Sequence, residues 1–270
     1  MLLRESGFTF GGLHSRRDMG LMYAEKDGHI AIPEIRRNSY TIAGMSGTLL
    51  MDGEAWQPFV FEGTLYPAAE PRTQQEAQAL IRRWAAWLTS GRQRLIFDYE
   101  PGVFYLAELT AQSKWSLRNW FGGELQVKWT AQPFAYNVEK DEESREFGSG
   151  TAVGSIEIEV NTGQPAPLKL QVENLGSGTV TAVGVGDAIQ FSGLALGPGE
   201  ALRVDLEPPA GAVMGTEGAY VNALPLATAF APVLLNGGVN TVPISVEYEG
   251  ASAADVTRAV RVNVGARGRW

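Results

Sequence analysis

Residues 125–137 read LQVKWTAQPFAYN, and this stretch decides how the first half of the chain is interpreted. Apolar and polar residues alternate from Leu125 to Thr130, a period of two that predicts a half-buried β-strand. Pro133 follows, and because proline has no N–H for a sheet ladder, we expect it to stop the strand or to sit on its edge. The aromatic residues that follow, ending in Tyr136, would then hold the chain against a core where it leaves a domain.

The chain of 270 residues changes character after this stretch. Residues 1–137 contain 14 Lys+Arg and 14 Asp+Glu, whereas residues 138–270 contain 8 and 16, so the net charge of −8 belongs to the second half. Six of the seven tryptophans lie in the first half, and 19 of the 32 glycines lie in the second. Such different halves favour two domains. Neither half is basic, so we expect no nucleic-acid binding through neutralised phosphates.

Composition also bounds the compartment and the chemistry. No apolar run approaches the length of about 18 residues that spans a bilayer, so we expect no membrane insertion. The N-terminal residues MLLRESGFTF lack the features of a signal peptide, so we expect the protein to be made in a cytoplasm and not to be secreted by the usual route. With no cysteine, disulfides, thiol nucleophiles and thiolate metal sites are excluded.

The first half contains one helix signal among several strand signals. Thr73 and Glu76 have the spacing of a capping box at the start of TQQEAQALIRRWAAWL, and apolar residues recur there at spacings of three and four. This pattern predicts a helix over residues 73–89 that packs its apolar stripe on a sheet. Together with strand patterns such as FVFEGTLY, it predicts an α+β domain, a sheet or small barrel with one helix, over residues 1–138.

The second half contains a different pattern. Residues 139–154 are first charged and then rich in glycine and serine, which predicts a linker. Residues 155–270 contain many short strand candidates separated by glycine and proline, which predicts a β-sandwich of jelly-roll type. The predicted fold class is therefore mainly β with one helix.

No reaction centre can be identified in the sequence. The two histidines, His14 and His29, have no partner at metal-ligand spacing, and the common nucleophile and phosphate-loop motifs are missing. Two carboxylate pairs have the i, i+2 spacing of a solvated strand face, which is not the cross-cleft arrangement of a glycosidase: Glu157 with Glu159, and Asp205 with Glu207. The sequence predicts no catalytic residue, no metal and no cofactor, and a protein that is not an enzyme.

Three aromatic residues close together leave an alternative open. Trp115, Trp120 and Phe121 precede a Gly-Gly turn and could stack on sugar rings. They could equally belong to a core or to a subunit interface, where tryptophan is also enriched.

Taken in order, several segments of the chain resemble the distal tail (Dit) proteins of long, non-contractile-tailed phages. In the first half the resemblance rests on DMGLMY, YTIAGMSGTLLMDG, FVFEGTLY, the helix ending in WL, LIFDYEPGVFYLAEL, and the closing residues Pro133–Tyr136. In the second half it rests on NTGQPAPLKLQVENLGSG, LGPGEALRVDLE and LNGGVNTVPIS. The central segment reads AGMSG where the family has a charged form, so no role of an Arg or Asp there is carried over.

The resemblance implies a structural protein of the virion tail tip that is assembled in the cytoplasm of the bacterial host. Six copies would form a ring through their first domains, with a peripheral, often galectin-like sandwich pointing outward. The expected partners are other copies of the chain, the major tail tube protein, the tail-tip or baseplate hub protein, and a receptor-binding protein or host glycan.

Two further expectations complete the interpretation. The charged stretch containing Glu34, Arg36, Arg37 and Asn38 lies between apolar strand candidates, which suggests an extended hairpin that contacts the next subunit. As an alternative function, the second-half sandwich could serve as a carbohydrate-binding or cell-surface adhesin module.

Overall fold

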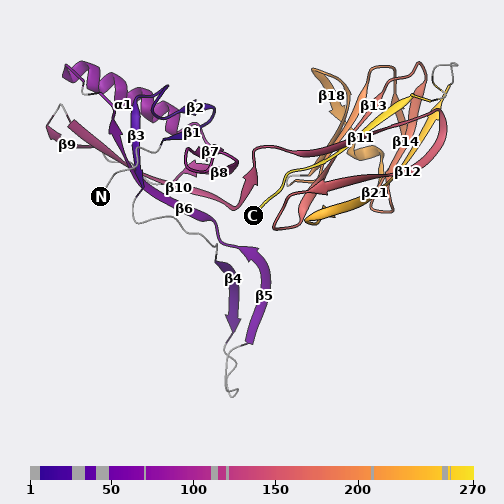
Figure 1. The fold of residues 1–270 in the computed structure, drawn as a ribbon, viewed down its shortest axis with the longest axis horizontal. Helices are drawn as coiled ribbons and strands as arrows, with labels where there is room; N and C mark the ends of the chain where they lie inside the picture. The colour runs from indigo at the N-terminus through magenta and orange to yellow at the C-terminus, as the bar shows by residue number, and fades with distance from the viewer. Residues whose placement is uncertain are drawn as a thin grey trace. The chain divides into compact units, whose positions relative to one another are not determined.

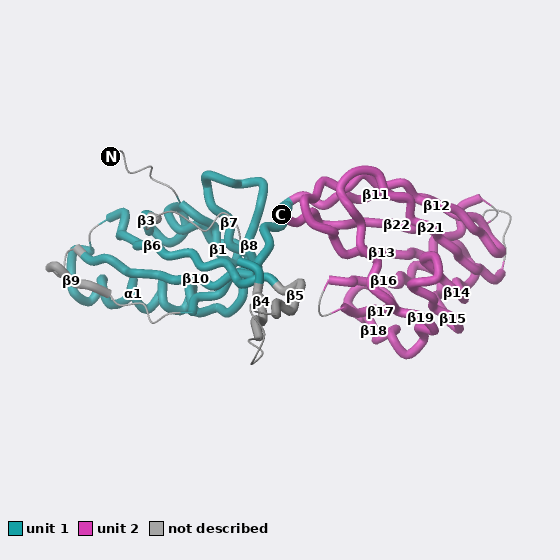
Figure 2. The backbone as a smooth tube through the Cα atoms, turned by 90° about the horizontal axis from the view of Figure 1, so that it is seen from below, with its two compact units in different colours: residues 1–138 teal, residues 139–270 magenta. Residues whose placement is uncertain are grey.

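The chain folds into two compact units, Met1–Val138 and Glu139–Trp270, coloured separately in Figure 2. The computed structural model describes residues 7–25, 34–40, 49–69, 71–110, 115–119, 122–207, 210–250, 255 and 257–270. In these residues unit 1 combines strands with one α-helix, and unit 2 is built of strands and a short 3₁₀ turn (Figure 1).

Unit 1 is built on an antiparallel sheet with the strand order β2-β1-β7-β8-β10-β6-β3, and β9 pairs with β10 outside this order. The strands are β1 (Phe8–Phe10), β2 (Leu13–His14), β3 (Leu21–Glu25), β6 (Phe59–Pro67), β7 (Gln93–Phe97), β8 (Val103–Leu109), β9 (Trp115–Asn119) and β10 (Gly122–Asn137). A separate two-stranded sheet consists of β4 (Ile35–Tyr40) and β5 (Leu49–Trp56).

The predicted helix is confirmed as α1 (Gln74–Leu88). Thr73 is its N-cap, and the Thr73 hydroxyl accepts a hydrogen bond from the Glu76 backbone N–H at 3.1 Å. The Glu76 carboxylate accepts from the N–H of Arg72 at 2.9 Å, so the capping residues satisfy two backbone donors at the helix start.

The two tryptophans of α1 fix the helix to the sheet. Trp84 and Trp87 are both buried, and each indole N–H donates to a backbone carbonyl 2.9 Å away, that of Met19 and that of Phe10 respectively. The Trp87 ring also stacks on Phe8 with 5.5 Å between centroids. The apolar stripe therefore packs against the unit's own sheet, as predicted, with the polar edge of each indole satisfied.

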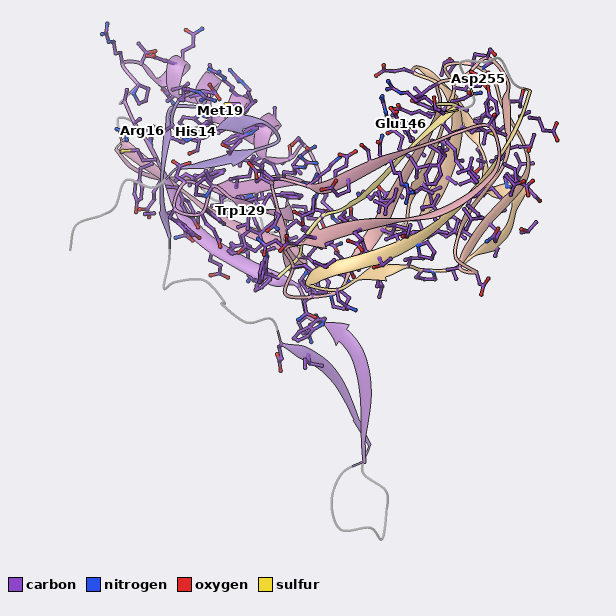
Figure 3. All side chains as sticks on the ribbon, turned by 45° about the vertical axis from the view of Figure 1, so that its right-hand side comes forward. His14, Arg16, Met19, Trp129, Glu146 and Asp255 are labelled. Carbon is purple, nitrogen blue, oxygen red and sulfur yellow. The ribbon has the colours of Figure 1, made fainter. Side chains whose placement is uncertain are left out.

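The core of unit 1 is mostly aromatic. Trp129 of β10 is fully buried in its interior (Figure 3). Phe8 and Tyr23 meet Trp129 edge to face, with centroid distances of 5.1 Å and 5.9 Å. Phe61 and Phe97 extend the cluster, 5.2 Å from each other. Edge-to-face pairs of this kind add about 0.5–1.5 kcal/mol beyond the burial of area, so the aromatic contacts contribute to the stability of unit 1.

The prediction that Pro133 stops its strand is wrong, because β10 continues to Asn137. Pairing with β6 ends where Ala131 meets Phe59, so beyond that point β10 has no partner on this side among the described strands. On the β8 side the register shifts between Ala131 and Ala135, which forms a bulge around the proline. A bulge is one of the few positions in a sheet where a missing N–H is tolerated.

Unit 2 is a sandwich of two antiparallel sheets. The larger has the order β11-β22-β13-β16-β17-β18, with β20 also paired to β13, and the smaller has the order β12-β21-β14-β15-β19. The strands are β11 (Asp141–Phe147), β12 (Gly150–Val160), β13 (Ala166–Asn174), β14 (Thr179–Val185), β15 (Ile189–Leu196), β16 (Ala201–Asp205), β17 (Gly211–Thr216), β18 (Ala219–Asn222), β19 (Ala227–Phe230), β20 (Leu234–Leu235), β21 (Gly238–Glu249) and β22 (Val260–Ala266), with a 3₁₀ turn η1 (Leu224–Leu226).

The core of unit 2 is aliphatic. It is built from alternate residues along the strands, which point inward: in β22, for example, Val260, Val262 and Val264 are fully buried. Phe191 of β15 is one of the few aromatic side chains buried in it. The predicted fold class, mainly β with one helix in the first half and a sandwich in the second, is confirmed.

The linker predicted over residues 139–154 is wrong: this segment belongs to unit 2 and contains β11 and the start of β12. β11 is an edge strand whose charged side chains face solvent, a common protection against edge-to-edge pairing. Its Glu146 accepts hydrogen bonds from Arg258 and Arg261, which lower the pKa of the Glu146 carboxyl. Arg145 donates to the Ser155 carbonyl on β12 at 2.7 Å, joining the edges of the two sheets.

Candidate interaction surfaces

The β4–β5 hairpin carries the residues predicted as a subunit interface. Arg36, Arg37 and Asn38 lie on β4, and Glu34 directly precedes it, with its carbonyl accepting from the Gln57 N–H at 2.7 Å. Among the described strands, β4 and β5 pair only with each other. An isolated two-stranded hairpin is only marginally stable in water, so this element is a candidate for contact with another surface.

The residues considered for catalysis do not meet in one place. Glu157 and Glu159 are exposed on β12, and His29 lies outside the described residues. Asp205 and Glu207 both accept a hydrogen bond from Lys169 Nζ at 2.8 Å. Burial lowers the pKa of Lys169, but these two hydrogen bonds outweigh that effect and raise it overall. In the described part of the chain, no group of three or more His, Cys, Asp or Glu side chains could hold a metal ion.

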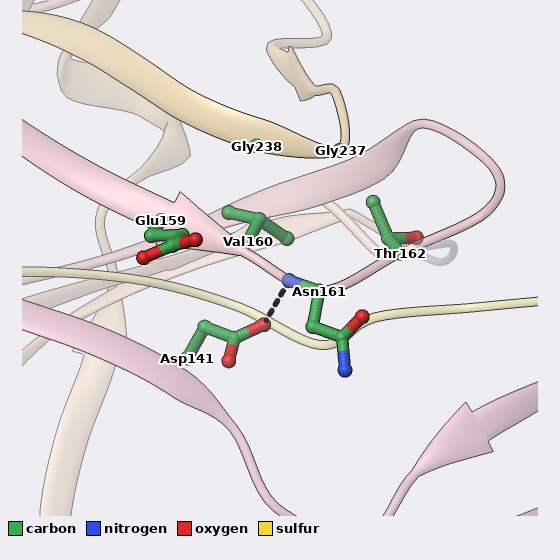
Figure 4. A pocket seen from close by; sticks show the side chains of 7 residues that line it. All are labelled: Asp141, Glu159, Val160, Asn161, Thr162, Gly237 and Gly238. Atoms are coloured by element: carbon green, nitrogen blue, oxygen red, sulfur yellow. Dashed lines mark hydrogen bonds between the residues drawn. The ribbon is translucent and has the colours of Figure 1, made fainter.

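Unit 2 contains an open, mainly polar cavity of about 610 Å³ (Figure 4). Its wall is held by local hydrogen bonds: Asp141 Oδ2 accepts from the Asn161 N–H at 2.9 Å. On the opposite side, Asn240 Nδ2 donates to the carbonyls of Asn236 and Gly238 at 2.8 Å and 2.9 Å. The cavity is lined by Asp141, Glu159, Val160, Asn161, Thr162, Gly237 and Gly238.

A second polar surface is the outer face of the larger sheet. Asn263 of β22 is the register partner of Gln171 of β13, which in turn pairs with Arg203 of β16. The Arg203 guanidinium lies 4.9 Å from the ring centroid of Tyr220 on β18. Arg203 makes no ion pair within the described residues, so amide and guanidinium donors stand side by side on this face.

These two surfaces are not identifiable from the sequence. Alternation along each strand shows which residues point outward, but not that β13, β16 and β22 are neighbours. Trp115, Trp120 and Phe121, which were considered for sugar stacking, have side chains outside the described part of the chain. None of the described helices has the length and apolar character needed to span a membrane.

Comparison with known proteins adds one finding about the fold. No protein-family model matches the sequence, and no curated protein matches it. The solved structure of the Dit protein (gp 19.1) of phage SPP1 is similar, with a TM-score of 0.64 over 98% of this chain and 99% of that one, at 11% sequence identity. The SPP1 protein is described as a paradigm of the hub adsorption apparatus in phages that infect Gram-positive bacteria. The chain therefore has a Dit-like fold across both units.

Proposed function

We propose that this chain is a structural protein of a phage tail and forms a homohexameric ring at the tail tip. The observation that carries the proposal is the fold match to SPP1 Dit, which extends over both units and almost all of each chain. A match limited to the sandwich would be uninformative, because sandwiches host many unrelated functions. The match also includes the less common first unit.

In the proposed arrangement, unit 1 builds the ring and unit 2 forms the periphery. The ring would join the major tail tube protein on one side and the tail-tip or baseplate hub protein on the other. A closed ring needs a head-to-tail interface whose rotation closes. Unit 1 up to residue 137 has equal numbers of acidic and basic residues, which permits close packing of copies, whereas the −8 charge of the remainder suits a solvated rim.

We assign the β4–β5 hairpin, with Glu34, Arg36, Arg37 and Asn38, to the contact between neighbouring copies. Its two strands have no further strand partner among the described residues, and contact with a second copy would supply one source of the missing stabilisation. This assignment concerns one interface only and is independent of what unit 2 binds.

Negative-stain imaging of the purified full chain tests the ring proposal. We expect closed six-fold rings with a central opening. The proposal would be refuted if all particles had monomer size even when the protein was kept concentrated until just before it was applied to the grid. Imaging of the chain mixed with purified tail tubes would then show whether the ring caps the tube end.

A second candidate function is carbohydrate binding by unit 2. It is favoured by the outer face of the larger sheet, where Asn263, Gln171 and Arg203, which makes no ion pair with the described residues, offer hydrogen-bond donors and acceptors suited to hydroxyl groups. A glycan array probed with the full chain tests it. Binding that is lost in Arg203→Ala and kept in the control Arg258→Ala supports it, and absence of binding to every glycan on the array contradicts it.

A further inference from the structure

The imidazole of His14, which is labelled in Figure 3, lies at the centre of a hydrogen-bond cluster in unit 1. Its Nδ1 accepts from the backbone N–H groups of Arg16 and Arg17, both at 3.1 Å. Its Nε2 lies 3.2 Å from both carboxylate oxygens of Asp98. Asp98 Oδ2 also accepts from the Gly7 N–H at 2.9 Å, so the cluster connects the first described residue to the end of β7.

These contacts determine the protonation state of the ring. A nitrogen that accepts from two N–H groups carries no hydrogen of its own, so Nδ1 of His14 is unprotonated. The hydrogen of the neutral ring is then on Nε2, where it is donated to Asp98. His14 Nδ1 thus takes the place that an Asn or Asp side-chain oxygen takes in a turn, where it accepts from the backbone two and three residues ahead.

We propose that His14 is a proton-dependent latch for the loop His14–Gly20. Protonation would put a hydrogen on Nδ1 that faces two N–H donors, so the two contacts to Nδ1 would be lost. The contact between Nε2 and Asp98 would remain and become an ion pair. The loop's other hydrogen bonds, such as those from the N–H groups of Asp18 and Met19 to the His14 carbonyl, do not involve the ring, so protonation would loosen the loop without releasing all of it. The proposal concerns the fold of unit 1 and holds whether or not the chain forms rings.

The charged groups that face the His14 imidazole come from the end of β7 and from the loop itself. Asp98 faces it from the end of β7, while β1 contributes no charge, since His14 pairs there with Thr9. Within the loop, Arg17 binds the Asp18 carboxylate at 3.1 Å. The hydrogen bond from Arg17, followed by that from the His14 N–H, lowers the pKa of Asp18 to about 2. Asp18 thus stays ionised where an ordinary imidazole titrates, near about pH 6.5.

Opening of the loop would be transmitted to α1. The Met19 carbonyl accepts from the Trp84 indole, and the Asp18 carbonyl accepts from Arg83 Nη2 at 2.9 Å. Ser15, the residue after His14, is fully buried, and its hydroxyl accepts a hydrogen bond from the Phe8 N–H at 3.1 Å. The His14 side chain is 20% exposed, so solvent protons reach it without unfolding of the unit. Protonation of one ring would therefore loosen the contacts between the loop and the helix.

Hydrogen–deuterium exchange of the full chain, read by mass spectrometry at about pH 5 and about pH 8, tests the latch. After correction for the intrinsic pH dependence of exchange, we expect peptides covering residues 15–20 to lose about tenfold in protection at the lower pH, the size of effect expected from two lost hydrogen bonds. Peptides from β6 serve as the internal control and should not change.

Two variants separate the latch from general acid loosening. In His14→Asn the side-chain oxygen can still accept from the loop but cannot be protonated, so protection should persist at both pH values. In His14→Phe the acceptor is missing. The loop should therefore be as weakly protected from exchange at both pH values as it is in the natural chain at the lower pH. Loop protection in the natural chain that is independent of pH, or an unchanged pH response in His14→Asn, would overturn the proposal.

Discussion

The ring of Tyr136 stacks on the ring of Phe104, with 5.4 Å between the centroids and 19° between the ring planes. The two residues are register partners on β10 and β8, and both are buried. The guanidinium of Arg94 lies 4.7 Å from the centroid of Phe104 and extends the stack. This stack fixes the end of β10 directly before the chain passes from unit 1 to unit 2.

Replacement of Tyr136 by alanine should therefore destabilise unit 1 by about 3 kcal/mol, since it removes a buried aromatic side chain and the stacking contact that this side chain makes with Phe104. Denaturant unfolding followed by tryptophan fluorescence measures this, because six of the seven tryptophans lie in the first half. Tyr66→Ala is the matched control: Tyr66 is 37% exposed, and its loss should have a much smaller effect. Equal effects of the two variants would show that the stack contributes nothing special.

Charge reversal in the hairpin should weaken self-association. The double variant Arg36→Glu/Arg37→Glu inverts two charges on β4 that we assign to the contact between copies. A variant with the same charge change elsewhere, Arg72→Glu/Arg82→Glu, controls for net charge, because both of these residues are exposed at or on α1. Light scattering should show loss of the oligomer in the first variant alone. Unchanged assembly in the hairpin variant would remove the hairpin from the interface.

Unit 2 should lose stability in alkali through Tyr248. Burial raises the pKa of the Tyr248 phenol, whose hydroxyl donates to Asp255 Oδ2 at 3.1 Å. Because the folded state favours the protonated phenol, this contribution is complete below the ordinary pKa of about 10 and is lost as pH rises above it. We expect the urea concentration at the unfolding midpoint to be lower at about pH 11 than at about pH 8. The decrease should be smaller in Tyr248→Phe. The same fall in both proteins would assign the effect to other groups.

Acid should act on unit 1 through Asp18, whose pKa is lowered to about 2, first by the hydrogen bond from Arg17. The ionised carboxylate is favoured in the folded state, so its contribution is complete above about pH 4 and is lost as pH falls toward about 2. The stability of Asp18→Asn should change less steeply over this range than that of the natural chain. Parallel curves would show that Asp18 has no part in acid unfolding.

Local sequence patterns predicted the elements whose determinants are close together in the chain. The helix start at Thr73 and Glu76 is an example, because a capping box acts across three residues. The strand FVFEGTLY is another: it alternates buried and partly buried residues over most of β6. Charged residues 139–154 were misread as a linker because an edge strand and a solvated connection have the same composition.

Features that depend on distant partners were not predictable. Pro133 is accommodated because pairing with β6 stops at Phe59 and because β10 itself bulges opposite β8, and neither fact is visible in LQVKWTAQPFAYN. The cavity of unit 2 combines Asp141 with residues about 20 and about 100 positions further along the chain. The contact of His14 with Asp98 depends on the pairing of β1 with β7, which the sequence does not show.

The account depends most on unit 1 associating with copies of itself, and the molar mass of the purified full chain in solution tests this directly. Light scattering coupled to size separation should give six times the chain mass of 29.1 kDa. The oligomer should persist on dilution, since obligate interfaces bury more than about 2,000 Å². A mass of 29.1 kDa at every concentration examined would contradict the account.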